Sequence, residues 1–319
     1  MKKILMMLLA AAIVGAGVTP TDVEAASKKK AVAAKKKAPR AAKPNRVKHV
    51  VRARSAHRIA SLDDAQHLAL QSSAALVLDQ TTGAVLFEKN PSAILPIASI
   101  TKLMTAMVVL DAKPDLTETL AISEQDVDIL KGTRSRLKVG THLAREEMLR
   151  LALMSSENRA AAALSRNYPG GREAFISAMN QKAQALGLVD TRFQDPTGLT
   201  AANVSSPRDL AKMVDAAHQY PLIREFSTTS EGEFSIAGRP QQFRNTNTLV
   251  KNPTWEIGLS KTGYINEAGK CLVMQAWLNN KPTIIVLLDS WGKMTRIGDA
   301  NRIKRWVESA SLAQRQSAG

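Results

Sequence analysis

The strongest constraint on the fold is that strand patterns occur at both ends of the chain, with helical patterns between them. Near the start, the apolar runs 74–78 and 84–87 flank the polar segment 79–83, a pattern typical of a β-hairpin. Near the end, apolar runs predict three further strands, over 257–262, 272–278 and 283–288, with a turn at 279–282. We therefore expect an α+β fold with one mainly antiparallel sheet built from both chain ends and flanked by helices.

The middle of the chain repeats apolar residues at helical spacing. Ser206 and Pro207 open one of these segments, with Ser as N-cap and Pro at the first helical position. A closing helix would present Ile297, Ile303, Trp306, Val307 and Ala310 along one stripe. The predicted helices include 99–112, 145–155, 172–186 and 295–312. The helical middle is then expected to form an insertion over the sheet.

The first 25 residues have the three parts of a secretory signal peptide. Two lysines precede the apolar run 4–18, and Val23 and Ala25 supply small residues at the −3 and −1 positions. Cleavage is expected after Ala25, with Ala26 as the alternative. The apolar run is short for a membrane-spanning helix, so no transmembrane anchor is expected, although an uncleaved anchor is the less favoured alternative.

The net charge of +16 on the 319 residues is concentrated near the start of the chain. Residues 1–58 hold 15 of the 44 Lys and Arg but only Asp22 and Glu24, which leaves 29 basic and 26 acidic residues, or about +3, over 59–319. Residues 26–60 are therefore expected to form a disordered basic linker. This linker is expected to be either a solvated tether or a segment that binds anionic envelope polymers weakly through electrostatic attraction. Nucleic acid is not expected as a partner, because the folded part is almost neutral.

Neither thiol nor metal chemistry is indicated. The chain has a single cysteine, Cys271, which cannot form an internal disulfide and lies in an apolar run, where a buried structural role is expected. The five histidines are never paired at metal-ligand spacing, so no metal and no other cofactor is expected. They are His49, His57, His67, His142 and His218.

A candidate nucleophile lies at Ser99, three residues before Lys102. If a helix begins near Ser99, the lysine amine can reach the serine hydroxyl. A serine needs a neighbouring base, and a lysine serves only if burial or a nearby cation depresses its pKa. The same Ser-x-x-Lys spacing begins at Ser27, Ser135 and Ser290, but of the four only Ser99 opens a strongly apolar helix.

Two further motifs follow in the chain. Ser156-Glu157-Asn158 lies between helical segments, where Ser156 can relay a proton and Asn158 can bind a substrate amide. Lys261-Thr262-Gly263 ends a predicted strand. It offers a cation, a hydroxyl donor and a glycine that lets another backbone approach, and a peptide could pair with that strand edge.

With the three motifs in this order, the chain resembles the low-molecular-mass penicillin-binding proteins, which are serine D-Ala-D-Ala peptidases. The resemblance is greatest to endopeptidases of the penicillin-binding protein seven type, and it spans about 74–307. It also includes the segments 96–98, 154–159, 195–199 and 243–247.

The resemblance implies a serine β-lactamase/DD-peptidase-like fold, with a catalytic domain over 61–312 and a flexible tail over 313–319. It implies that Ser99 is acylated, that Lys102 accepts its proton and that Ser156 passes a proton to the leaving amine. Asn158 would hold the substrate amide. Lys261 and Thr262 would shape the electrostatics at the bound peptide end, and Gly263 would also be a substrate-binding residue. The backbone N–H groups of Ser99 and Tyr264 would hold the oxyanion.

The implied activity is hydrolysis of peptidoglycan peptide cross-links in the periplasm by a soluble or peripherally membrane-associated enzyme. Its substrates would be stem peptides and their cross-links, and β-lactams would inhibit it covalently. Two alternatives stay open: a D-alanyl-D-alanine carboxypeptidase, and a non-catalytic envelope-binding protein that retains the motif residues.

Overall fold

The computed structural model describes residues 68–292 and 294–317, with side chains of the last helix described as far as Ala310. The expected signal peptide (1–25) and basic linker (26–60) lie outside the described residues.

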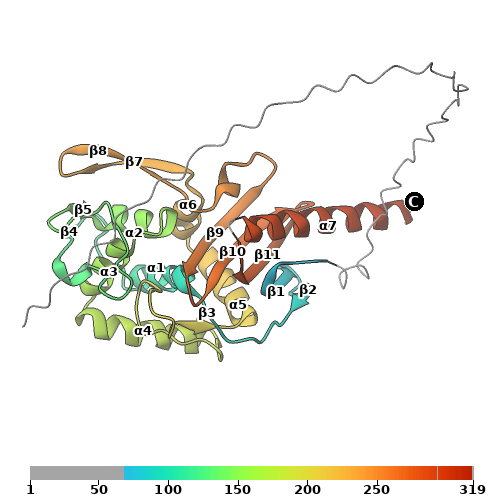
Figure 1. Ribbon diagram of the computed structural model, residues 1–319, viewed down its shortest axis with the longest axis horizontal. Helices are drawn as coiled ribbons and strands as arrows, with labels where there is room; N and C mark the ends of the chain where they lie inside the picture. Colours follow the sequence, from blue (N-terminus) through green and yellow to red (C-terminus); the bar gives the residue numbers. More distant parts are fainter. Residues whose placement is uncertain (1–67, 293, 318–319) are drawn as a thin grey trace, which may run out of the picture. The chain divides into compact units, whose positions relative to one another are not determined.

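A five-stranded sheet unites the two ends of the folded part (Figure 1). The strand order is β2-β1-β11-β10-β9, and every neighbouring pair is antiparallel. The strands are β1 (Ser72–Asp79), β2 (Val85–Lys89), β9 (Glu256–Ile265), β10 (Gly269–Leu278) and β11 (Lys281–Ser290). The expected α+β sheet built from both chain ends is thus confirmed. β9 is an edge strand, so one of its sides is free of other strands of the sheet.

The turn between β10 and β11 is shorter than the sequence indicated. It consists of Asn279 and Asn280, which both have positive φ (50° and 60°). Two-residue hairpins favour this conformation because its twist matches that of the strands, and asparagine tolerates it. Pro282, expected in the turn, belongs to β11.

The two faces of the sheet pack against different helices, because successive strand residues point to opposite sides. On one face Val77, Met274 and Leu287 pack with the stripe of α7 (Thr295–Ser317). That stripe includes Ile303 and Trp306, as expected, and α7 continues beyond the predicted end at Leu312. The opposite face contributes Leu76, Val273 and Val286 to a larger core shared with the helices of the insertion.

The chain between β2 and β9 forms the helical insertion, and helices α1–α4 lie beside the β9 side of the sheet (Figure 1). Its α-helices are α1 (Thr101–Asp111), α2 (Arg145–Met154), α3 (Asn158–Arg166), α4 (Gly171–Ala185), α5 (Pro207–His218) and α6 (Pro221–Thr228). Short 3₁₀ helices are η2 (Ala98–Ile100), η3 (Glu124–Asp126) and η4 (Thr248–Lys251). Paired outside the main sheet are β3 (Leu95–Pro96) with β6 (Val204–Ser205), β4 (Thr119–Ala121) with β5 (His142–Ala144), and β7 (Glu231–Ile236) with β8 (Arg239–Arg244).

Two helix starts can be compared directly with the sequence. Ser206 caps α5, because its hydroxyl accepts the backbone N–H of Asp209 (3.3 Å), and Pro207 occupies the first position, as expected. The helix expected from Ser99 begins instead as the 3₁₀ turn η2, and the α-helix follows from Thr101.

Cys271 is free and fully buried, and burial raises the pKa of its thiol to about 11. The expected structural role is consistent with a thiol that stays protonated. None of the helices in the described part of the chain is both long and apolar enough to cross a bilayer.

The buried carboxylate of Asp299 joins the last helix to the first strand. It accepts the backbone N–H groups of Gln71 (3.0 Å) and Ser72 (2.8 Å) and the Ser72 hydroxyl (2.7 Å), and it also pairs with Arg302. Removing the carboxylate would leave the buried N–H and hydroxyl of Ser72 without this partner, and that costs more than the bonds themselves contribute.

We expect Asp299→Ala to lower the free energy of unfolding by about 3 kcal/mol. Asp215→Ala is the matched control, because Asp215 also lies on a helix but accepts one exposed bond from Gln80, and it should change stability by less than about 0.5 kcal/mol. Urea denaturation measures both. Equal, small losses in the two variants would show that Asp299 does not hold the chain ends together.

Candidate active site

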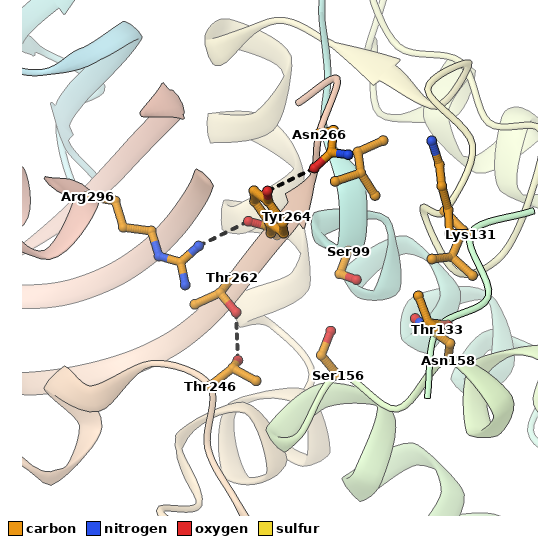
Figure 2. A pocket seen from close by; sticks show the side chains of 13 residues that line it. Ser99, Lys131, Thr133, Ser156, Asn158, Thr246, Thr262, Tyr264, Asn266 and Arg296 are labelled. Carbon is orange, nitrogen blue, oxygen red and sulfur yellow. Dashed lines mark hydrogen bonds between the residues drawn. The ribbon is translucent and has the colours of Figure 1, made fainter. Parts of the chain in front are cut away.

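The three sequence motifs meet at one pocket of about 450 Å³ (Figure 2). Side chains or backbone of six of the eight expected site residues line it, and the remaining two, Lys102 and Lys261, are buried next to it. The six are Ser99, Ser156, Asn158, Thr262, Gly263 and Tyr264. Residues more than 150 positions apart in the sequence therefore share one pocket.

The backbone around Ser99 is held between two glycines. A Cβ on Gly263 of β9 would lie 2.8 Å from the carbonyl oxygen of Ile97 and 3.2 Å from the Ser99 nitrogen. On the other side, a Cβ on Gly198 would lie only 1.9 Å from the carbonyl oxygen of Ala98. Ala98 itself has a positive φ of 47°, a strained conformation for alanine. Close packing on both sides thus fixes the turn that presents Ser99, and the close approach expected at Gly263 is present.

Lys102 is completely buried, and its amine is hydrogen-bonded to three oxygens. Nζ lies 2.9 Å from Ser99 Oγ, 2.7 Å from Asn158 Oδ1 and 2.7 Å from the carbonyl oxygen of Thr197. Burial lowers the pKa of Lys102 to about 7, although the negative charges of Asp195 and Glu157 act in the opposite direction. A substantial fraction of this amine is therefore neutral near pH 7, and a neutral amine next to a serine hydroxyl can accept its proton.

Ser156 and Lys261 form a second hydroxyl–amine pair in the same pocket. Ser156, in the connection between α2 and α3, has a positive φ of 60°, and its Oγ accepts a hydrogen bond from Lys261 Nζ (2.9 Å). Lys261 also donates to the carbonyl oxygen of Thr262 (3.1 Å). Burial lowers the pKa of Lys261 well below its usual value, and the positive charges of Lys102 and Arg296 lower it further.

The Asn158 amide is engaged at both ends within the protein. Its Oδ1 accepts from Lys102, and its Nδ2 donates to Thr133 Oγ1 (3.1 Å). The residue begins α3, so the first turn of that helix sets its position. In this geometry Asn158 orients the Lys102 amine, a contact that the motif pattern alone did not indicate.

The opposite wall is formed by β9 and by residues that sequence analysis did not select. Thr262 Oγ1 donates to Thr246 Oγ1 (2.6 Å), and Arg296 Nη1 donates to the carbonyl oxygen of Gly263 (3.0 Å; Figure 2). Arg296 Nη1 also donates to the carbonyl oxygen of Cys271 (3.3 Å). Thr246 lies within segment 243–247, which the family resemblance had included, whereas Arg296 lies in the first turn of α7 and belongs to none of the motifs. Among the described residues, no group of three or more His, Cys, Asp or Glu side chains could hold a metal ion.

Comparisons with known proteins agree with this arrangement. A family profile described as D-alanyl-D-alanine carboxypeptidase, peptidase family S11, matches residues 61–292. The chain is 52% identical to a Pseudomonas aeruginosa protein named D-alanyl-D-alanine endopeptidase and 49% identical to an Escherichia coli protein of the same name. Each match spans 76% of this chain and 79% of the relative.

A solved structure supports the same assignment. The crystal structure of the Streptomyces K15 DD-transpeptidase superimposes with a TM-score of 0.70 at 28% identity, over 75% of this chain and 97% of that one. The expected serine DD-peptidase fold is thereby confirmed. Since the family profile covers most of the chain and the fold is shared, the chain belongs to the D-alanyl-D-alanine carboxypeptidase family, peptidase family S11, and is a serine-type D-Ala-D-Ala peptidase.

Proposed function

We propose that this peptidase is an endopeptidase that hydrolyses the peptide cross-links of peptidoglycan through an acyl-enzyme on Ser99. The observation that carries the proposal is the buried Lys102 amine, 2.9 Å from Ser99 Oγ and with a pKa lowered to about 7. A base poised near the working pH is the most effective proton acceptor for a hydroxyl nucleophile.

Acylation begins when Ser99 Oγ attacks the carbonyl carbon on the acyl side of the scissile bond, while its proton moves to Lys102 Nζ. The oxyanion lies between the backbone N–H groups of Ser99 and Tyr264. The C–N bond then breaks, and the leaving amine takes a proton through Ser156, which accepts a hydrogen bond from Lys261. Lys102 then passes the proton it took from Ser99 to Lys261, whose own proton went through Ser156 to the leaving amine, so Lys102 is neutral again. Water attacks the ester carbon while Lys102 accepts its proton. The ester C–O bond breaks as Lys102 returns that proton to Ser99 Oγ, and the acyl part leaves as a carboxylic acid that ionises.

The substrate peptide binds along the free edge of β9, where main-chain hydrogen bonds can extend the sheet. Its leaving end lies beside Lys261 and Thr262, and Arg296 adds positive charge to that end of the pocket. Asn158 holds the substrate amide, which requires its amide group to exchange one of its two internal bonds.

The proposed preference for cross-links over terminal D-alanine is supported by the names and identities of the relatives. Those named D-alanyl-D-alanine endopeptidase reach 52% and 49% identity, whereas relatives named D-alanyl-D-alanine carboxypeptidase, such as those of Bacillus subtilis and Escherichia coli, match at 34% and 30%. Three relatives with the endopeptidase name precede those with the carboxypeptidase name in similarity.

The enzyme acts in the periplasm. Residues 1–25 direct export as a signal peptide, and the catalytic domain over 61–312 works as a soluble or peripherally held enzyme. The basic residues of the linker, 26–60, support attraction to anionic envelope polymers, an interaction that added salt should weaken.

Ser99→Ala is expected to abolish covalent labelling by penicillin, because a β-lactam must be opened by the same hydroxyl. Lys102→Ala should slow acylation by about three to four orders of magnitude, since general-base catalysis alone contributes roughly 10²–10⁴-fold and the amine also orients Ser99. Mass spectrometry of the penicillin-treated protein gives the modified peptide. Near-normal labelling of either variant would contradict the assignment, and unchanged thermal unfolding serves as the control for folding.

The acylation rate should rise with pH through about 7 and then level off. Deprotonated Lys102 is the active form, and the fraction of this form increases above its pKa, which burial lowers to about 7. The second-order rate constant for penicillin acylation, measured between pH 5 and pH 9, tests this expectation. A rate that does not change across this range would mean that Lys102 is not the titrating base.

Purified cross-linked muropeptides distinguish the endopeptidase from the carboxypeptidase. The mature protein should convert dimers to monomers, and Ser99→Ala should not, because the C–N bond of the cross-link is cleaved only through the ester. Chromatography with mass spectrometry identifies the products. Release of D-alanine alone, with the dimers intact, would assign the carboxypeptidase activity instead.

A further inference from the structure

An ion pair links the two walls of the active-site pocket. Lys131 lies in the segment between η3 and β5, on the side of the helical insertion, and Glu267 lies in the turn between β9 and β10. The Lys131 amine donates to the Glu267 carboxylate, and the side chains are 31% and 44% exposed. This hydrogen bond lowers the pKa of Glu267, so its carboxylate is charged at neutral pH.

The backbone that carries Lys131 is anchored to the catalytic residues. The Asp128 carboxylate accepts the backbone N–H groups of Lys131 (3.0 Å) and Thr133 (2.9 Å). Thr133 in turn accepts a hydrogen bond from Asn158, which contacts Lys102. The backbone of Lys131 is therefore positioned relative to the catalytic centre, and Lys131 is one of the residues that line the pocket.

The pocket has a cationic group at each end. Arg296 lies on one side of Ser99 and Lys131 on the other (Figure 2). Along β9, Arg296 contacts Gly263, whereas Glu267, the partner of Lys131, follows the end of the strand at Ile265. A peptide aligned with β9 across Ser99 must therefore extend toward both cations.

We propose that Lys131 is a specificity-determining residue that binds a carboxylate on the acyl side of the scissile bond, with Glu267 occupying its amine until the peptide binds. The proposal rests on the proposed function, which places the leaving end of the peptide beside Lys261 and Thr262, so that the acyl part lies toward Ile265 and Lys131. When a substrate carboxylate replaces Glu267, the Lys131 amine keeps a carboxylate partner before and after binding. The displaced Glu267 side chain is exposed enough to be solvated by water.

The test compares two peptides that differ only in a free or an amidated side-chain carboxyl on the residue before the acyl D-alanine. Binding is measured by calorimetry on the full mature chain carrying Ser99→Ala, which prevents turnover. We expect the free acid to bind about three- to tenfold more tightly, a range typical of a partly exposed ion pair. Lys131→Met should abolish the difference, whereas Lys131→Arg should retain it.

Two further variants sharpen the result. Glu267→Gln should tighten binding of the acidic peptide and leave the amidated one unchanged, because Lys131 then lacks its competing partner. Lys251→Met is the matched control, since Lys251 forms a similarly exposed ion pair with Glu231 and does not line the pocket, and it should keep the preference for the acid. In the active enzyme, Lys131→Met should raise KM for the acidic peptide with kcat unchanged.

Equal losses of affinity for the two peptides in Lys131→Met, or no preference for the acid before substitution, would overturn the proposal. Failure of the proposed function gives a different result. In that case the parent enzyme leaves cross-linked muropeptides uncut, while the comparison of acid and amide on the Ser99→Ala chain still reports on Lys131.

Discussion

The site depends on one costly feature, an amine buried without a carboxylate bonded to it. A lysine removed from water strongly favours its neutral form, and the three oxygens around Lys102 Nζ satisfy its hydrogen bonds without holding the charge as a salt bridge would. Asp195 and Glu157 are near enough to favour the charged form but not to pair with the amine directly, so the pKa lies at about 7. A small change in the surroundings of Lys102 is therefore enough to change its protonation state near neutral pH.

This arrangement also explains why the surrounding backbone is packed so closely. Lys102, 2.9 Å from Ser99 Oγ, is an effective base only if the hydroxyl keeps its orientation. Ser99 lies on a short 3₁₀ turn, which needs packing from neighbouring segments to stay in place. Gly263 and Gly198 let β9 and the 195–199 segment press against that turn from two sides. The strained φ of Ala98 is maintained by the same contacts. The glycines therefore position the nucleophile through close backbone packing.

Sequence patterns predicted most of the longer elements and missed several of the shorter ones. The five strands and helices α1, α2, α4, α5 and α7 were expected because alternation and helical spacing report burial directly. The β7–β8 hairpin lies outside the main sheet, and α6 has only eight residues, so neither left a strong pattern. In the site, hydroxyls and amines at fixed spacing were recognisable. The Thr197 carbonyl and the Arg296 guanidinium act through tertiary contacts, which no local spacing encodes.

The protonation states of the two buried lysines, Lys102 and Lys261, depend on each other. In the proposed reaction this dependence favours proton transfer toward the leaving amine. The charge on Lys102 is among the causes that lower the pKa of Lys261, since like charges in a low-dielectric site repel strongly. When Lys102 receives the proton of Ser99, any proton on Lys261 becomes easier to lose. Lys261 donates to Ser156, so the proton has a path toward the leaving amine at the moment the C–N bond breaks. When the Ser99–Lys102 pair takes up a proton, the Ser156–Lys261 pair therefore releases one more easily. Neither motif would show this behaviour alone.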